Sequence, residues 1–201
     1  MMSDHVSEGW QSVLDFWFQG ELLSDEQIHR WWKKDEKVDA WIKQQYSGLI
    51  DDIYDHLHQS WGQTAQGRLA AIICLDQFTR NAYRGDGKSF QYDDRAKQLA
   101  DEGLSQGHDK QLSLIERSFF IMPLMHDEDL ASQKRCIAFF EALVADSEGA
   151  LEKYFSGSLA FARKHSEIIE RFGRYPHRNN FLGRESTQDE LIFLEQPGSS
   201  F

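Results

Sequence analysis

Cysteine, positive charge and long apolar runs are all scarce in this chain of 201 residues. Its two cysteines, Cys74 and Cys136, lie far apart and form no Cys-x-x-Cys motif. This spacing excludes a zinc knuckle and a dithiol redox motif. We therefore expect two reduced cysteines in a hydrophobic core, as in a cytoplasmic protein.

The sequence also shows no segment typical of a targeting signal or of a membrane-spanning helix. The longest uninterrupted apolar run extends only from Leu69 to Leu75, well short of the roughly 20 residues that span a bilayer. The N-terminal segment contains Asp4, Glu8 and Asp15 and lacks the basic start and apolar block of a secretory signal. We therefore predict a cytoplasmic location and no membrane partner.

The charge balance is strongly acidic, with 22 basic and 33 acidic side chains and a formal net charge of −11. This balance argues against nucleic acid as a partner and against a membrane surface reached through a broad basic face. Hydrophobic residues make up 40%, including 6 Trp and 14 Phe. Such a composition excludes general disorder and supports a single domain over residues 1–201.

Apolar residues recur at helical spacing along almost the whole chain. Trp10, Val13, Leu14 and Trp17, for example, form one stripe on a helix. We find no alternating apolar and polar run of strand length. The sequence therefore predicts an all-α fold of about eight helices, arranged as antiparallel helical hairpins similar to tetratricopeptide repeats. The aromatic N-terminal region would offer a surface for a homodimer.

Two charged residues fall on an apolar helix face. The segment from Gly67 to Tyr83 is predicted as a helix, and at 100° per residue Asp76 and Arg80 lie in the middle of one apolar face. A buried charge must be paired, so the two side chains either pair with each other or point into one interior polar cluster. Because a buried ion pair contributes little net stability, we favour the cluster.

An imidazole precedes three carboxylates where another helix is expected to begin, with His126 followed by the acids at positions 127–129. Such a group could orient a general base. Alternatively, the acids are there because the helix dipole favours negative charge at an N-terminus. Three adjacent acids cannot all face one ion, so we predict no metal site, and no cofactor motif is present.

Residues 171–184 contain four arginines and no acid, in an otherwise acidic chain. Guanidinium groups match the geometry of carboxylates and phosphates, so this segment predicts a receptor for an anion. The alternative is that these arginines pair internally with the surplus acids, including Asp76 and Glu128.

Together these segments predict one interior-facing polar pocket that binds a small anionic molecule or a peptide carboxylate. Arginines would hold the anion, while Asp76, Glu128 and Asn179 would fix their geometry. The predicted lining consists of Asp76, Gln77, Arg80, Asn81, His126, Glu128, Arg174, His177, Arg178 and Asn179.

Two alternatives to simple binding remain open. In a hydrolase, His126 or His177 would act as a general base oriented by Glu128 or Asp76, and arginine would stabilise the developing negative charge. No Ser or Cys nucleophile is matched to either His, so water would attack. In an interaction scaffold, the helical hairpins would bind a peptide along a concave face, and the polar cluster would be purely structural.

Four segments carry a resemblance to a known family: residues 75–81 (LDQFTRN), 122–129 (MPLMHDED), 172–179 (FGRYPHRN) and 182–187 (LGREST). In these segments the chain resembles the uncharacterised domain of unknown function 924 family, and the match covers nearly the whole chain in order. The resemblance implies an all-helical fold similar to tetratricopeptide-like hairpins and implies no activity. The chain departs from the family at Thr79 and Asp127, where the family often has proline and serine.

Overall fold

The computed structural model describes residues 5–56 and 60–200, and all of its regular elements within these ranges are helical. Asp4, one of the acids in the N-terminal segment, lies outside them. The α-helices are α1 (His5–Phe18), α2 (Asp25–Trp32), α3 (Glu36–His56), α4 (Ala65–Ile72), α5 (Thr79–Ala82), α6 (Asp93–Ser105), α7 (Leu114–Phe120), α8 (Met122–His126), α9 (Leu130–Ala145), α10 (Gly149–Phe172) and α11 (Gln188–Leu194). The predicted all-α fold is confirmed for this part of the chain.

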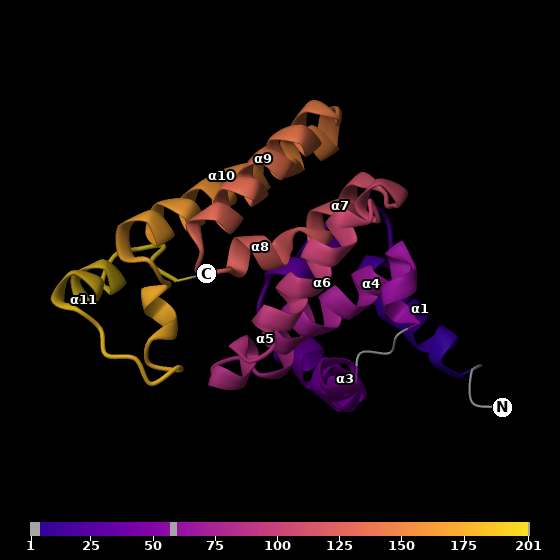
Figure 1. The fold of residues 1–201 in the computed structure, drawn as a ribbon, viewed down its shortest axis with the longest axis horizontal. Coiled ribbons are helices and arrows are strands. Elements are labelled where there is room, and N and C mark those ends of the chain that lie inside the picture. Colours follow the sequence, from indigo (N-terminus) through magenta and orange to yellow (C-terminus); the bar gives the residue numbers. More distant parts are fainter. Residues whose placement is uncertain (1–4, 57–59, 201) are drawn as a thin grey trace.

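Helix α4 is buried along almost its whole length. Helices α1, α6 and α7 pack against it. Helices α9 and α10 form a long antiparallel pair along one side of the molecule, and α11 lies beyond the far end of this pair (Figure 1). The largest fully buried side chains include Trp17, Trp61, Tyr92, Phe119 and Phe155.

Local capping sets the ends of the helices that position the C-terminal half. Asp129 begins α9 by accepting a hydrogen bond from the backbone nitrogen of Ser132, and acids are favoured at this end of a helix. Helix α10 ends at Gly173, whose φ of 68° is the left-handed geometry that glycine adopts without strain. Thr187 and Glu190 form a capping box that begins α11.

The helix predicted from Gly67 to Tyr83 exists but is not uniform. Between α4 and α5, residues Ile73–Phe78 form a π-helical turn, in which hydrogen bonds reach one residue further than in an α-helix. The assumption of 100° per residue is therefore wrong for this segment. Asp76 lies inside the π turn and is 0% exposed, and such turns often occur at functional sites.

The aromatic residues of the N-terminal half divide between core and surface. Trp17 and Trp31 are buried, whereas Trp32 and Trp41 are 46% and 41% exposed. A homodimer through this surface stays a prediction. Within residues 5–56 and 60–200, no helix has both the length and the apolar character needed to cross a bilayer.

Candidate functional site

A buried carboxylate and an imidazole from different helices form the centre of the site. Helix α8 carries Pro123 in its first turn, where the missing N–H of proline costs nothing, and ends at His126. The Nδ1 atom of His126 lies 2.6 Å from Oδ1 of Asp76 in the π turn. Gln77 donates a hydrogen bond of 2.5 Å to the other carboxylate oxygen. The Asp76 carboxylate is therefore held on both sides.

A second carboxylate, Asp93 at the start of α6, joins two arginines from distant parts of the sequence. Arg80 donates from Nη1 and Nη2 to the two carboxylate oxygens of Asp93, each at 3.0 Å. Arg178 donates from Nη1 to Oδ2 of Asp93 at 3.3 Å. Arg80 also lies 3.6 Å from Oδ1 of Asp76. Asp93 thereby connects the arginine-rich segment to the Asp76–His126 pair.

Asp93 could not be identified from the sequence, for a physical reason. Asp93 is followed by Asp94, and both stand in the first turn of α6, where acids are favoured by the helix dipole alone. No residue spacing in the sequence distinguishes the acid that faces inward from its exposed neighbour. Its two arginine partners, Arg80 and Arg178, are 13 and 85 residues away in the sequence.

The electrostatics of the central pair keep a charged carboxylate beside a neutral imidazole. Burial raises the pKa of Asp76, but the charges of a protonated His126 and of Arg80, with side-chain hydrogen bonds from His126 and Gln77, outweigh it and lower that pKa to about 2. Burial and the charge of Arg80 lower the pKa of His126 below its usual value, against the opposing effect of Asp76. Near pH 7 the Nδ1–H group of His126 therefore donates to Asp76, and Nε2 carries the lone pair.

Aromatic rings surround the Arg178 guanidinium. Its central carbon lies 4.8 Å from the ring centroid of Phe90 and 4.5 Å from that of Tyr175, which is a favourable cation–π geometry. The side chain is 8% exposed, and its Nε is buried without a hydrogen-bond partner in the described part of the chain. Burial, more than the attraction of Asp93, determines the pKa of Arg178, which is lowered.

Two further histidines lie near this centre. The ring of His165 on α10 is 6.5 Å from that of His126 and 5.6 Å from that of Tyr175. His177 lies 5.7 Å from the Tyr175 ring. Burial lowers the pKa of His165 to about 3 and, with the charge of Arg178, that of His177 to about 4. Both imidazoles are therefore neutral near pH 7.

Glu128 does not contact the central pair but anchors the C-terminal segment. Its two oxygens accept hydrogen bonds of 2.6 and 3.0 Å from Arg184. One of them also accepts from the backbone nitrogen of Tyr175 at 2.8 Å. Burial raises the pKa of Glu128, but these bonds and the charge of Arg184 give a net lowering. This arrangement matches the alternative in which arginines pair internally with acids.

Three other predicted residues lie in separate networks. Arg174 binds both oxygens of Glu190 at 2.7 and 2.8 Å, and Asn179 donates to the same carboxylate at 3.3 Å. Asn81 donates to Asp39 on α3 at 2.8 Å. Arg174 and Asn179 thus hold α11 in place through Glu190. Asn81 connects α5 to α3 through Asp39.

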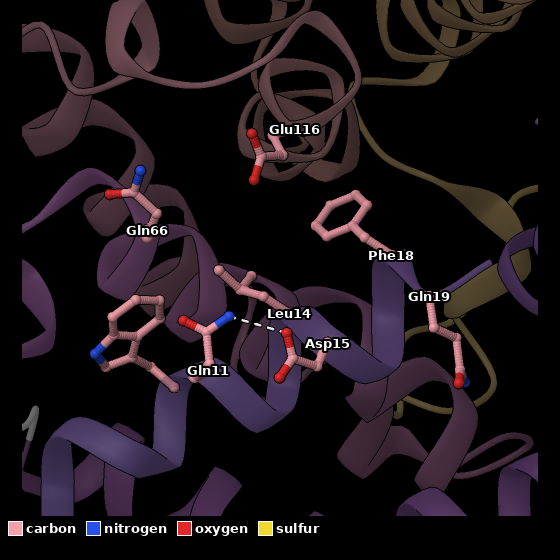
Figure 2. Close-up of a pocket in the computed structure, with 8 residues that line it drawn as sticks. Gln11, Leu14, Asp15, Phe18, Gln19, Gln66 and Glu116 are labelled. Carbon is pink, nitrogen blue, oxygen red and sulfur yellow. Dashed lines mark hydrogen bonds between the residues drawn. The ribbon is translucent and has the colours of Figure 1, made fainter. Parts of the chain in front are cut away.

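Of the ten predicted residues, only Arg174 lines either of the two hollows described here, so one pocket lined by all ten stays a prediction. Arg174 lines a hollow of about 430 Å³ beside α11 that does not include Asp76, His126 or Arg178. A larger hollow, of about 670 Å³, lies along α1 (Figure 2). Salt bridges divide the arginines of the basic segment among three carboxylates, with Arg174 bound to Glu190, Arg178 to Asp93 and Arg184 to Glu128.

The fold and the site define an all-α protein with a buried carboxylate–imidazole pair. Its sequence places it in a known family. The family described as "Bacterial protein of unknown function (DUF924)" matches residues 13–198. The chain therefore belongs to this family, as the four segments predict. No curated protein matches.

A solved structure supports the same fold. The chain is similar to a protein of unknown function from Agrobacterium tumefaciens, with 31% sequence identity and a TM-score of 0.81. The match covers 96% of this chain and 99% of the other. The likeness to tetratricopeptide repeats stays a prediction.

Proposed function

We propose that this protein is a water-activating hydrolase for a small ester that carries an anionic group, with His126 as the general base. The observation that carries the proposal is the 2.6 Å contact between Nδ1 of His126 and Oδ1 of Asp76. A carboxylate on Nδ1 holds the imidazole in the tautomer whose Nε2 can accept a proton. Of His126 and His177, this contact favours His126 as the base.

The charges around the pair suit this role. An imidazole whose pKa is lowered is neutral near pH 7 and ready to take a proton from water. The ionised Asp76 carboxylate, which stays charged because its pKa is about 2, stabilises the imidazolium formed when His126 takes that proton. Asp76 is a positioning residue in this scheme, since it acts on the substrate through His126.

Arg178 supplies the group that would hold the anion. Its Nε–H has no hydrogen-bond partner among the residues that the structure describes, and its guanidinium is linked through Asp93 to the Asp76–His126 cluster. Buried guanidinium groups bind carboxylates and phosphates strongly. The same side chain would stabilise negative charge that develops as water attacks.

The proposed step balances in atoms and charge. Nε2 of His126 takes a proton from water while the water oxygen forms a bond to the carbonyl carbon or phosphorus of the ester. The imidazolium then returns the proton to the leaving oxygen as its bond to that centre breaks. The products are an acid and an alcohol.

Hydrolysis of chromogenic esters tests the proposal. We expect the protein to hydrolyse the anionic esters 4-nitrophenyl hemisuccinate or 4-nitrophenyl phosphate faster than neutral 4-nitrophenyl acetate. His126→Gln is expected to lower kcat/KM about 100-fold, since a general base typically contributes at least this factor. His29→Gln, at a histidine whose side chain is 46% exposed on α2, is the matched control and should leave the rate unchanged. No turnover, or equal turnover in H126Q, would contradict the proposal.

Anion binding without turnover is the second candidate, favoured by the unpartnered Nε of Arg178. Succinate or phosphate at ten times its Kd would stabilise the native state by about 1.4 kcal/mol, which raises Tm by about 3–5 °C in a protein of this size. Arg178→Lys keeps the charge beside Asp93 but removes Nε–H, so the rise should shrink. A rise of equal size in R178K, or none in the parent protein, would exclude Arg178 as the anion receptor.

A further inference from the structure

A hollow along α1 lies apart from the proposed active site. Its volume is about 670 Å³, within the roughly 300–1,000 Å³ typical of small-molecule pockets. Figure 2 shows Glu116 of α7 on the opposite side of this hollow from Gln11, Leu14 and Asp15 of α1. The residues that line this α1 groove are Trp10, Gln11, Leu14, Asp15, Phe18, Gln19, Gln66 and Glu116.

The groove has an apolar stripe beside a polar one. Trp10, Leu14 and Phe18 are spaced four residues apart, so they lie on one face of α1. A polar stripe beside it on α1 consists of Gln11 and Asp15, and Gln19 follows directly after the end of the helix. A ligand lying along this groove would therefore meet aromatic and aliphatic surface on one side and carboxylate or amide oxygens on the other.

The two charged groups of the groove are both acids. Asp15 uses Oδ1 to accept a hydrogen bond of 2.9 Å from Gln11, and Glu116 uses Oε2 to cap α7 through Ser113. The remaining oxygen of each carboxylate has no hydrogen-bond or ion-pair partner within residues 5–56 and 60–200. Among the residues that the structure describes, no Lys, Arg or His lines the groove. The groove thus holds two carboxylates that no described basic side chain neutralises, beside two aromatic rings.

We propose that the α1 groove binds a small organic cation with an apolar body. The ammonium group would contact the carboxylates of Asp15 and Glu116, while the apolar body would lie over Trp10, Leu14 and Phe18. Aromatic faces attract cations directly, and the net charge of −11 raises the local concentration of cations at the surface. This site is opposite in charge preference to the anion site proposed at Arg178.

Tryptamine and tryptophol provide a matched pair of probes, because they share the indole and differ in carrying an ammonium or a hydroxyl group. Isothermal titration should detect binding of tryptamine at millimolar concentration and much weaker binding of tryptophol. The double variant Asp15→Asn with Glu116→Gln should weaken tryptamine binding about tenfold, as expected for two partly exposed ion pairs. Both substitutions are conservative, and glutamine also completes a capping box.

The control variant removes two acids elsewhere. Glu167→Gln with Glu170→Gln changes two exposed positions on α10, and tryptamine binding should stay as in the parent protein. Three results would overturn the proposal: no tryptamine binding by the parent protein, equal binding of tryptophol, or equal binding by the D15N/E116Q variant. If the control weakens binding as much as the groove variant, the effect is one of total charge and the proposed site is wrong.

Discussion

Asp93→Asn is expected to lower the free energy of unfolding by about 3 kcal/mol, the lower end of the range for breaking a buried ion pair. The Asp93 carboxylate accepts hydrogen bonds from both Arg80 and Arg178, whose side chains are 22% and 8% exposed. Without it, the two guanidinium groups would lose the carboxylate that they share, and Arg80 would keep its 3.6 Å contact with Asp76. Asparagine keeps the size and one acceptor oxygen, so the loss reports mainly on charge.

Urea denaturation followed by tryptophan fluorescence measures this loss. Asp94→Asn is the matched control, because Asp94 is the next residue of α6, is exposed and makes no ion pair among the described residues. Substitutions at such surface positions usually change stability by less than about 0.5 kcal/mol. If D93N and D94N lose the same amount, Asp93 does not hold the cluster together.

Acid is expected to remove about 2 kcal/mol of stability through Asp76 alone. The pKa of Asp76 is lowered from 3.8 to about 2 in the folded protein, because the charges of a protonated His126 and of Arg80, with hydrogen bonds from His126 and Gln77, outweigh the opposing effect of burial. A carboxyl group with a depressed pKa stabilises the fold above its unfolded pKa. This contribution is fully present near neutral pH and is lost as the pH falls from about 4 through about 2.

Comparison with Asp76→Asn isolates this residue from other acids. Arg174 also lowers the pKa of Glu190 to about 2. The stability that Glu190 contributes is therefore lost in the same pH range, but equally in both proteins. The free energy of unfolding should therefore fall by about 2 kcal/mol less in D76N than in the parent protein between about pH 5 and pH 2. Parallel losses in the two proteins would show that Asp76 titrates normally.

The central site was partly predictable because its members break a local rule. Asp76 and Arg80 are charged residues in an apolar helix, and they lie close to His126 as an interior cluster requires. Arg178 belongs to an arginine-rich segment, which marks it as an anion receptor or an ion-pair partner, and in the fold it pairs with Asp93. Such signals need only the sequence, since polarity on an apolar face is a local pattern.

Other features followed no local pattern. The π turn around Asp76 has the same apolar periodicity as an ordinary helix, so residue spacing could not reveal it. Arg174 and Asn179 have the same residue types as Arg178 and lie close to it in sequence, yet they bind Glu190 on α11. The α1 groove depends on how α7 packs across α1, which positions Glu116 opposite Asp15.

Helix content, the excess of acid and the membership of a family are properties of residue order and composition, and they were readable without coordinates. Helical periodicity arises from neighbours three and four positions apart, so a linear pattern is enough to reveal it. Which acid each arginine pairs with was decided by packing in the folded protein. That choice depends on distance and burial, and contacts such as the one between Asp93 and Arg178 join residues far apart in the chain.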